Sequence, residues 1–220
     1  MILWMASYPR SGNTLARMAI YRGYGVKTWS LHGNGYLEQS GLENLGFVFG
    51  SCKGLHGPGP FFPVKTHADS PTRHPIDTPA IYIHRDGRDA LISHAHFLYK
   101  GRKKPLQALR ELARGTKSGI PPWSDAVMAW ADRPRTSYVS YEELLEDAIG
   151  AIGRCLEELD IPWEKVESPK MPTFEYLHSI DPVFFRKGTH EQWQTEMSVD
   201  LQEAFWARHG EGMEHYGYSH

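Results

Sequence analysis

The chain has 220 residues, of which 40% are apolar and 23% are charged, and its formal net charge is −2. This composition is ordinary for a globular protein, and the length favours one domain spanning residues 1–220 with a sizeable core. The small net charge argues against a protein that coats nucleic acid, so we expect no nucleic-acid partner.

The cysteines and the first residues bear on the cellular compartment. Cys52 and Cys155 lie far apart and lack the spacing of a metal site, which favours free thiols in a reducing compartment. Residues 1–5 lead straight into an apolar run, without the basic segment that opens a signal peptide. No apolar run approaches the roughly 20 residues that span a bilayer. We therefore expect a cytoplasmic protein without a membrane span.

Patterns of apolar residues and turn formers predict the secondary structure in chain order. Residues 2–7 form an apolar run bounded by Pro9 and Gly12, which predicts a buried strand followed by a helix over 13–22. Residues 30–62 are rich in glycine and are predicted to be largely irregular, a loop region or lid. Further along we expect a strand at 64–67, a strand at 80–84, a helix at 89–99, a short helix within 100–122, a helix at 124–133, a strand at 136–140 and a last helix near 199–215.

The segment after residue 140 carries the clearest helix signal. Ser140 followed by Glu143 is a capping box, and Pro162 ends the helix. One stripe of this helix is predicted to be buried, and it consists of Leu144, Leu145, Ala148, Ile149, Ile152, Leu156 and Leu159. Because strand, loop and helix alternate, we expect an α/β fold with a mainly parallel sheet and helices on both faces. Ligands bind such folds at the carboxyl ends of the strands.

The loop after the first strand, Tyr8 to Thr14, is a candidate anion site. It reads YPRSGNT, and it lacks the lysine after Gly12 and the earlier glycine that a Walker A loop needs. Its small residues let backbone N–H groups approach an anion at a helix N-terminus, and Arg10 adds a permanent positive charge. The alternative is a plain strand-to-helix turn shaped by proline and glycine.

Two later loops carry the other candidate anion ligands. HRDGRDALIS, residues 84–93, lacks the asparagine of a protein-kinase catalytic loop, which leaves Arg85 and Ser93 as a charged and a neutral donor for a phosphate. FRKG, residues 185–188, places two cations before a glycine that allows a compact loop. The alternative for residues 84–93 is a set of ion pairs among their charged side chains. The alternative for residues 185–188 is an ordinary basic surface turn.

Together these segments resemble the sulfotransferase family. SYPRSGNT is similar to the family's 5′-phosphosulfate loop, YIHRDGRDALISHAHF to its 3′-phosphate segment, and FRKG to its C-terminal RKG loop. Between them, VKTH at 64–67 resembles the KTH segment, and YVSYEEL at 138–144 resembles a strand-to-helix junction. The resemblance implies a three-layer fold like that of P-loop NTPases. It also implies transfer of a sulfuryl group from 3′-phosphoadenosine-5′-phosphosulfate (PAPS) to a small-molecule alcohol, phenol or amine.

The resemblance further implies roles for individual residues. His67 would be the general base, Lys65 would stabilise the transferring group, and Arg10, in place of the family's lysine, would stabilise the leaving oxygen. The residues implied to bind the nucleotide are Arg10, Ser11, Gly12, Asn13 and Thr14 at the 5′-phosphosulfate, Arg85, Ser93, Arg186, Lys187 and Gly188 at the 3′-phosphate, and Tyr141 and Phe174 near the adenine. No metal is expected, because a sulfuryl group carries less charge than a phosphoryl group and fixed cations can replace magnesium.

The sequence departs from the family pattern at two positions. Leu15 stands where the family has an aromatic residue that helps to hold adenine, and Glu191 stands at the second glycine of RKGxxGxW. Two alternatives stay open: a non-catalytic nucleotide-binding protein, and an ATP-dependent small-molecule kinase, which would need a Walker lysine. The acceptor is not identified, and the aromatic residues that either line its pocket or pack in the core are Tyr36, Phe47, Phe49, Phe61, Phe62 and Trp123.

Overall fold

The computed structural model describes residues 1–31, 42–48, 60–67, 75–99 and 105–220. Its strands are β1 (Ile2–Ser7), β2 (Trp29–Ser30), β3 (Phe62–Thr66), β4 (Ala80–His84) and β5 (Thr136–Ser140). They form one sheet in the order β2-β3-β1-β4-β5, in which every neighbouring pair is parallel. The predicted α/β class with a parallel sheet is therefore confirmed.

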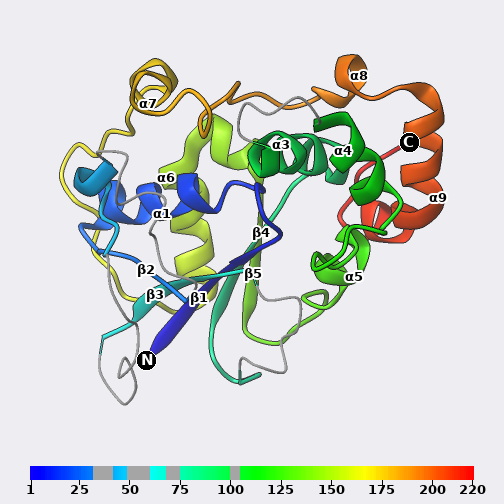
Figure 1. The fold of residues 1–220 in the computed structure, drawn as a ribbon. Coiled ribbons are helices and arrows are strands. Elements are labelled where there is room, and N and C mark those ends of the chain that lie inside the picture. The colour runs from blue at the N-terminus through cyan, green and yellow to red at the C-terminus, as the bar shows by residue number, and fades with distance from the viewer. Residues whose placement is uncertain (32–41, 49–59, 68–74, 100–104) are drawn as a thin grey trace.

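Helices cover both faces of this sheet (Figure 1). They are α1 (Asn13–Tyr24), α3 (Gly87–Tyr99), α4 (Pro105–Ala113), α5 (Trp123–Met128), α6 (Tyr141–Glu158), α7 (Phe174–Ile180), α8 (Trp193–Glu196) and α9 (Val199–His215), with a 3₁₀ turn η1 at Leu42–Leu45. Leu3 and Met5 of β1 pack with α1 and α6, whereas Trp4 and Ala6 pack with α3, α4, α5 and α9. Successive side chains of a strand point to opposite faces, so β1 lies between two cores in a three-layer arrangement.

Helix α6 confirms one prediction and corrects another. The Ser140 hydroxyl accepts from the Glu143 N–H, and the Glu143 carboxylate accepts from the Ser140 N–H, which is the predicted capping box. Asp147 interrupts the helix with φ −147° and ψ 83°, and its carboxylate accepts from the N–H of Gly150. Leu145, in the short segment before this interruption, is 36% exposed, so its predicted burial is wrong. In that short segment Leu144 is buried in place of Leu145, and the remaining predicted members of the stripe are buried.

Other element boundaries lie within a few residues of the predicted ones. The observed strands β1, β4 and β5 match the expected ranges, α3 begins two residues earlier than expected, and α5 ends at Met128 rather than Arg133. The sequence patterns do not predict β2, α7 or α8, which have two, seven and four residues and are too short for a periodic signal. Most of the predicted loop at 30–62, and all of the basic stretch at 100–104, lie outside the described residues.

The parallel strands bring the carboxyl ends of β1, β3, β4 and β5 to one edge of the sheet. The loop after β1, residue 67 after β3, residue 85 after β4 and the start of α6 therefore lie near one another. Within the described ranges, no helix combines the length and the apolar composition that crossing a bilayer requires.

Candidate active site

The loop between β1 and α1 is built around left-handed backbone conformations. Arg10 has φ 69° and Gly12 has φ 101°, and the second value suits glycine because a Cβ is strained there. A Cβ at Gly12 would also lie 2.7 Å from Cδ2 of Tyr141, so the tyrosine ring packs directly on this loop. Gly12 is the N-cap of α1 and supplies no side-chain cap. The positive end of the helix is thus left to backbone N–H groups, which suits an anion.

Ser11 and Asn13 are both buried in this loop. Asn13 donates its side-chain amide to the Met5 carbonyl at 2.8 Å and to the Ser7 hydroxyl at 3.2 Å, which ties the start of α1 to β1. Ser11 is buried, and its N–H donates to the carbonyl of Tyr8 at 3.3 Å. The Asn13 amide is thus engaged within the protein, whereas the Ser11 hydroxyl is buried without a hydrogen-bond partner among the described residues.

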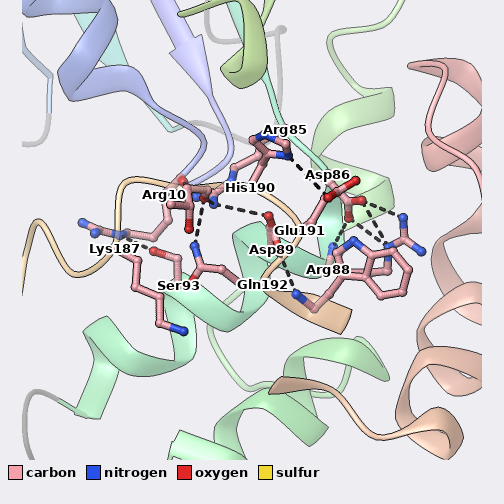
Figure 2. A network of polar contacts seen from close by, with 12 residues as sticks. Arg10, Arg85, Asp86, Arg88, Asp89, Ser93, Lys187, His190, Glu191 and Gln192 are labelled. Atoms are coloured by element: carbon pink, nitrogen blue, oxygen red, sulfur yellow. Dashed lines mark hydrogen bonds and ion pairs between the residues drawn. The ribbon is translucent and has the colours of Figure 1, made fainter. Parts of the chain in front are cut away.

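Arg10 connects three parts of the chain. Its Nε donates to the hydroxyl of Ser93 at 3.2 Å, and its Nη2 donates to the carbonyl of Phe184 at 2.6 Å. The guanidinium lies 4.3 Å from the ring centre of Phe184 and 5.0 Å from that of Phe97, in cation–π geometry. These contacts place Arg10 and Ser93 in one site, together with the C-terminal loop (Figure 2).

Arg85 is buried at the end of β4. It donates from Nη1 to the carbonyl of Arg10 at 3.1 Å and from Nη2 to the carbonyl of Thr189 at 2.9 Å. Its guanidinium carbon lies 4.1 Å from the ring centre of Tyr141, and its Nη2 lies 3.5 Å from the Asp89 carboxylate. The Nε of Arg85 has no hydrogen-bond partner among the described residues. A buried donor of this kind favours an anionic ligand.

Asp89 holds the loop at 186–193 against α3. Its Oδ1 accepts from the N–H of Trp193 at 3.0 Å. Burial raises the pKa of Asp89, although the charge of Arg85 and the N–H groups of Trp193 and Glu191 act in the opposite direction. Glu191 itself has φ 59°, the conformation that favours glycine at this position of the family pattern, and its side chain is 61% exposed. Glu191 therefore keeps the left-handed backbone conformation expected of the family's glycine, and its carboxylate points to solvent.

The end of β3 contributes Lys65 and His67. The Nδ1 of His67 lies 2.9 Å from the carbonyl oxygen of Ser7, which can only accept. Nδ1 therefore carries the proton, and the lone pair of the neutral ring is on Nε2. Burial, together with the positive charges of Arg17 and Arg10, lowers the pKa of Lys65 to about 7. The neutral form of Lys65 is therefore accessible near pH 7.

These residues surround one cavity of about 600 Å³. The predicted site residues that line it are Arg10, Gly12, Asn13, Thr14, Lys65, His67, Arg85, Ser93, Tyr141, Phe174, Arg186, Lys187 and Gly188. Ser11 is the predicted site residue that does not line it. Segments separated by up to about 180 positions in the sequence thus converge on a single space, as the order of the motifs predicts.

The cavity has an apolar wall beside the loop after β1. Leu15 lines it, and Met171 and Phe174 from the segment before and at the start of α7 line the same space. A Cβ at Gly188 would collide with the ring of Phe174, so this ring packs closely on the C-terminal loop. Phe174 therefore supplies an aromatic face to a site in which position 15 has none.

Sequence reasoning missed several residues of this lining. Phe97, Phe184 and His94 line the cavity. Of these three residues, only Phe97 could have been found from the sequence, because it occupies the last position of the 3′-phosphate segment. None of the described aromatic candidates for an acceptor pocket, Phe47, Phe61, Phe62 and Trp123, lines this cavity. Tyr36 and Phe49 lie outside the described residues.

The described part of the chain contains no group of three or more His, Cys, Asp or Glu side chains arranged to hold a metal ion. The cations of the cavity come instead from arginine and lysine side chains on four segments. Such fixed charges suit a ligand with several anionic groups.

Comparison with known proteins gives results consistent with this geometry. Mouse sulfotransferase 1 family member D1 is 27% identical over an alignment of 157 positions, and the alignment covers 59% of this chain and 52% of that protein. The chain thus spans about half the length of this relative.

Solved structures share the fold. A retinol dehydratase in complex with androsterone and the inactive cofactor PAP superposes with a TM-score of 0.66, 18% identity, and coverage of 97% of this chain and 80% of that one. Mouse sulfotransferase SULT7A1 in complex with PAP gives a TM-score of 0.68, 18% identity, and coverage of 96% and 83%. The family model for the sulfotransferase domain matches residues 74–217, which is more than half of the chain. The chain therefore belongs to the sulfotransferase domain family.

Proposed function

We propose that the protein transfers a sulfuryl group from PAPS to a hydroxyl or an amine of a small-molecule acceptor, in line and without a metal. His67 acts as the general base in this proposal. The observation that carries it is that His67 and Lys65, after β3, line the same cavity as Arg85, Ser93 and the cations of the C-terminal loop. One nucleotide with a 5′-phosphosulfate and a 3′-phosphate would need both groups of residues at once.

Two groups of residues divide the work of binding, and the hydrogen bond from Arg10 to Ser93 joins them. The backbone N–H groups after Gly12 and the side chains of Thr14 and Arg10 would hold the 5′-phosphosulfate. Arg85 and Ser93, joined by the loop at 186–188, would hold the 3′-phosphate, and the buried Nε of Arg85 supports an anion there. Tyr141 and Phe174 would lie along the adenosine.

His67 is oriented for proton removal at one atom. The hydrogen bond from Nδ1 to the Ser7 carbonyl fixes the tautomer, so Nε2 takes the proton of the acceptor hydroxyl. The Ser7 carbonyl still accepts from Nδ1 after the ring becomes charged, and this contact stabilises the imidazolium. PAPS, when bound, supplies the sulfuryl group and the bridging oxygen that leaves.

Lys65 and Arg10 would stabilise negative charge as it moves to the leaving oxygen. Arg10 is held by Ser93 and by the Phe184 carbonyl, so its guanidinium is ordered at the cavity before the donor binds. The pKa of Lys65 is about 7, and an anionic ligand favours its charged form. Lys65 therefore becomes protonated when the donor binds and keeps that charge during transfer.

The acceptor is proposed to be a small, largely apolar alcohol, phenol or amine. The cavity that His67 lines is also lined by apolar side chains, among them Phe97 and Phe184, so an apolar body can pack in it. Structures of the same fold were solved with androsterone and with retinol, which are molecules of this kind.

Two further proposals concern the setting of the chain. The continuous sheet supports one domain over residues 1–220. The free, buried thiol of Cys155 supports a reducing, cytoplasmic compartment.

Nucleotide binding and turnover together test the proposed function. We expect 3′,5′-adenosine bisphosphate (PAP) to raise the melting temperature of the protein, and ATP with magnesium to leave it unchanged. We expect labelled PAPS to transfer its label to at least one member of a panel of phenols, alcohols and amines. Stabilisation by ATP with magnesium alone would favour the kinase alternative. PAP binding without transfer to any acceptor would favour the non-catalytic alternative.

A further inference from the structure

Glu196, at the end of α8, is a junction of three positively charged or chargeable side chains. Its carboxylate accepts from Arg186 Nη1 at 3.0 Å and from Lys187 Nζ at 2.6 Å. On its other side, Oε2 lies 3.0 Å from Nε2 of His96 on α3. Gln192 completes the arrangement, because its side-chain oxygen accepts from Nη2 of Arg186 and its amide donates to the Thr189 carbonyl at 2.9 Å.

Glu196 lies behind these cations with respect to the cavity. Arg186, Lys187 and Gln192 all line the cavity of about 600 Å³, and Glu196 does not. It lines a separate, smaller hollow, shared with His96 and with apolar residues of α3 and α4. A phosphate in the cavity would therefore meet the cations from the side opposite to the carboxylate.

The carboxylate is ionised across the neutral range. Partial burial acts to raise the pKa of Glu196, but hydrogen bonds from Lys187, His96 and Arg186 outweigh it and lower the pKa to about 2. Lysine and arginine side chains lose rotamer freedom when they bind a ligand, which costs free energy. Glu196 therefore meets part of that cost before binding, because it already orders two such side chains.

We infer that Glu196 is a positioning residue that makes the site selective for 3′-phosphorylated nucleotides by fixing Arg186 and Lys187 at the cavity wall. This inference rests on the proposed function, which assigns these two cations to the 3′-phosphate. The negative charge of Glu196 also weakens the positive potential around the cations. The ordering of Arg186 and Lys187 outweighs this loss. Its consequence is specific, because a nucleotide without the 3′-phosphate does not use these cations.

The test compares two nucleotides on three proteins by titration calorimetry. The nucleotides are PAP and 5′-AMP, which differ only in the 3′-phosphate, and the proteins are the parent, Glu196→Ala and Glu175→Gln. Glu175 is an exposed acid on α7, next to Phe174, and its substitution removes a negative charge without touching Arg186 or Lys187. A thermal unfolding curve of each free protein separates a loss of folding from a loss of binding.

We expect Glu196→Ala to raise the dissociation constant of PAP roughly tenfold, which corresponds to one or two charge-assisted contacts. The dissociation constant of 5′-AMP should change less than twofold, and Glu175→Gln should leave both values within twofold. Glu196→Gln, which keeps an acceptor of the same shape, should give an intermediate loss. In the steady state, KM for PAPS should rise in Glu196→Ala while kcat stays within about twofold.

Distinct results overturn distinct claims. If the parent binds PAP more tightly than 5′-AMP and Glu196→Ala keeps that ratio or increases it, the positioning role is wrong and the proposed function stands. If both nucleotides weaken equally in Glu196→Ala, Glu196 supports the loop in general and the inference is also wrong. If the parent itself does not prefer PAP, the proposed function is contradicted, and the inference is contradicted with it.

Discussion

The loop after β1 and the loop at 186–193 both present positive charge to the cavity, but they are built differently. The first is fixed by backbone conformation, with Gly12 pressed against the Tyr141 ring and the Asn13 side chain bound to β1. The second is fixed by side chains, with Asp89 holding its N–H groups and Glu196 holding its cations. A backbone-built loop tolerates few substitutions, whereas a loop built from side-chain contacts accepts a change such as Glu191.

The largest expected effect in this comparison comes from Gly12→Ala. The left-handed φ of 101° and the contact with Tyr141 should together destabilise the protein by about 2–4 kcal/mol, measured by urea unfolding. PAP affinity should fall at least about tenfold, because the helix N-terminus would move. Gly188→Ala is the matched variant, with φ 63° and the partly exposed ring of Phe174 as its neighbour. If Gly188→Ala proved as costly as Gly12→Ala, the two loops would be equally rigid and the comparison would be wrong.

Asp89→Asn tests the anchor of the second loop. Asp89 is buried and faces Arg85, so loss of its charge leaves the guanidinium without its carboxylate and should destabilise the protein by about 2–4 kcal/mol. Chemical unfolding measures this loss, and Asp125→Asn is the control, because its pair with Arg208 is exposed and should contribute about 0–1 kcal/mol. If the two substitutions lowered the free energy of unfolding equally, Asp89 would not be the anchor of this loop.

Lys65 should give nucleotide binding a dependence on pH. Burial and the charges of Arg17 and Arg10 lower its pKa to about 7, so the free protein loses this positive charge as the pH rises through that value. PAP should therefore bind more weakly at pH 8 than at pH 6, by up to about tenfold. Lys65→Arg stays charged over this range, so the slope attributable to Lys65 should disappear in this variant. An unchanged slope would assign the pH dependence to another group.

The smallest expected effect comes from Glu191→Gly. The left-handed φ of 59° is strained for glutamate, whereas glycine adopts it freely but loses more entropy on folding. The two terms largely cancel, so we expect the free energy of unfolding to stay within about 0.5 kcal/mol of the parent and PAP affinity within about twofold. A strong gain in PAP affinity would mean that the Glu191 carboxylate opposes the ligand, despite its exposure.

The sequence predicts the sheet well because the apolar runs at 2–7 and 80–84, and the short alternating segment at 136–140, are followed by polar motifs. The prediction fails where an element is short, as in β2 and α8, or where one residue with non-helical backbone angles interrupts a helix. The interruption at Asp147 has no proline or glycine to mark it, so the pattern of α6 appears continuous and Leu145 appears buried.

The candidate site shows the same limit at the level of side chains. Motif order indicates which segments converge, and the cavity collects residues from all of them. Motifs do not indicate where a side chain points: the Asn13 amide binds Met5 and Ser7, and Ser11 does not line the cavity. Similarly, Glu196 lies outside every motif, because its role depends on how the fold brings Arg186, Lys187 and His96 to it.

The measurement that tests the central claim most directly is PAPS turnover by the parent and by His67→Ala, with PAP affinity measured on both. We expect kcat to fall about 10²- to 10⁴-fold in the variant, as removal of a general base predicts, while the dissociation constant of PAP stays within about twofold. Retained turnover, or a loss of PAP binding equal to the loss of turnover, would contradict His67 as the base in this cavity.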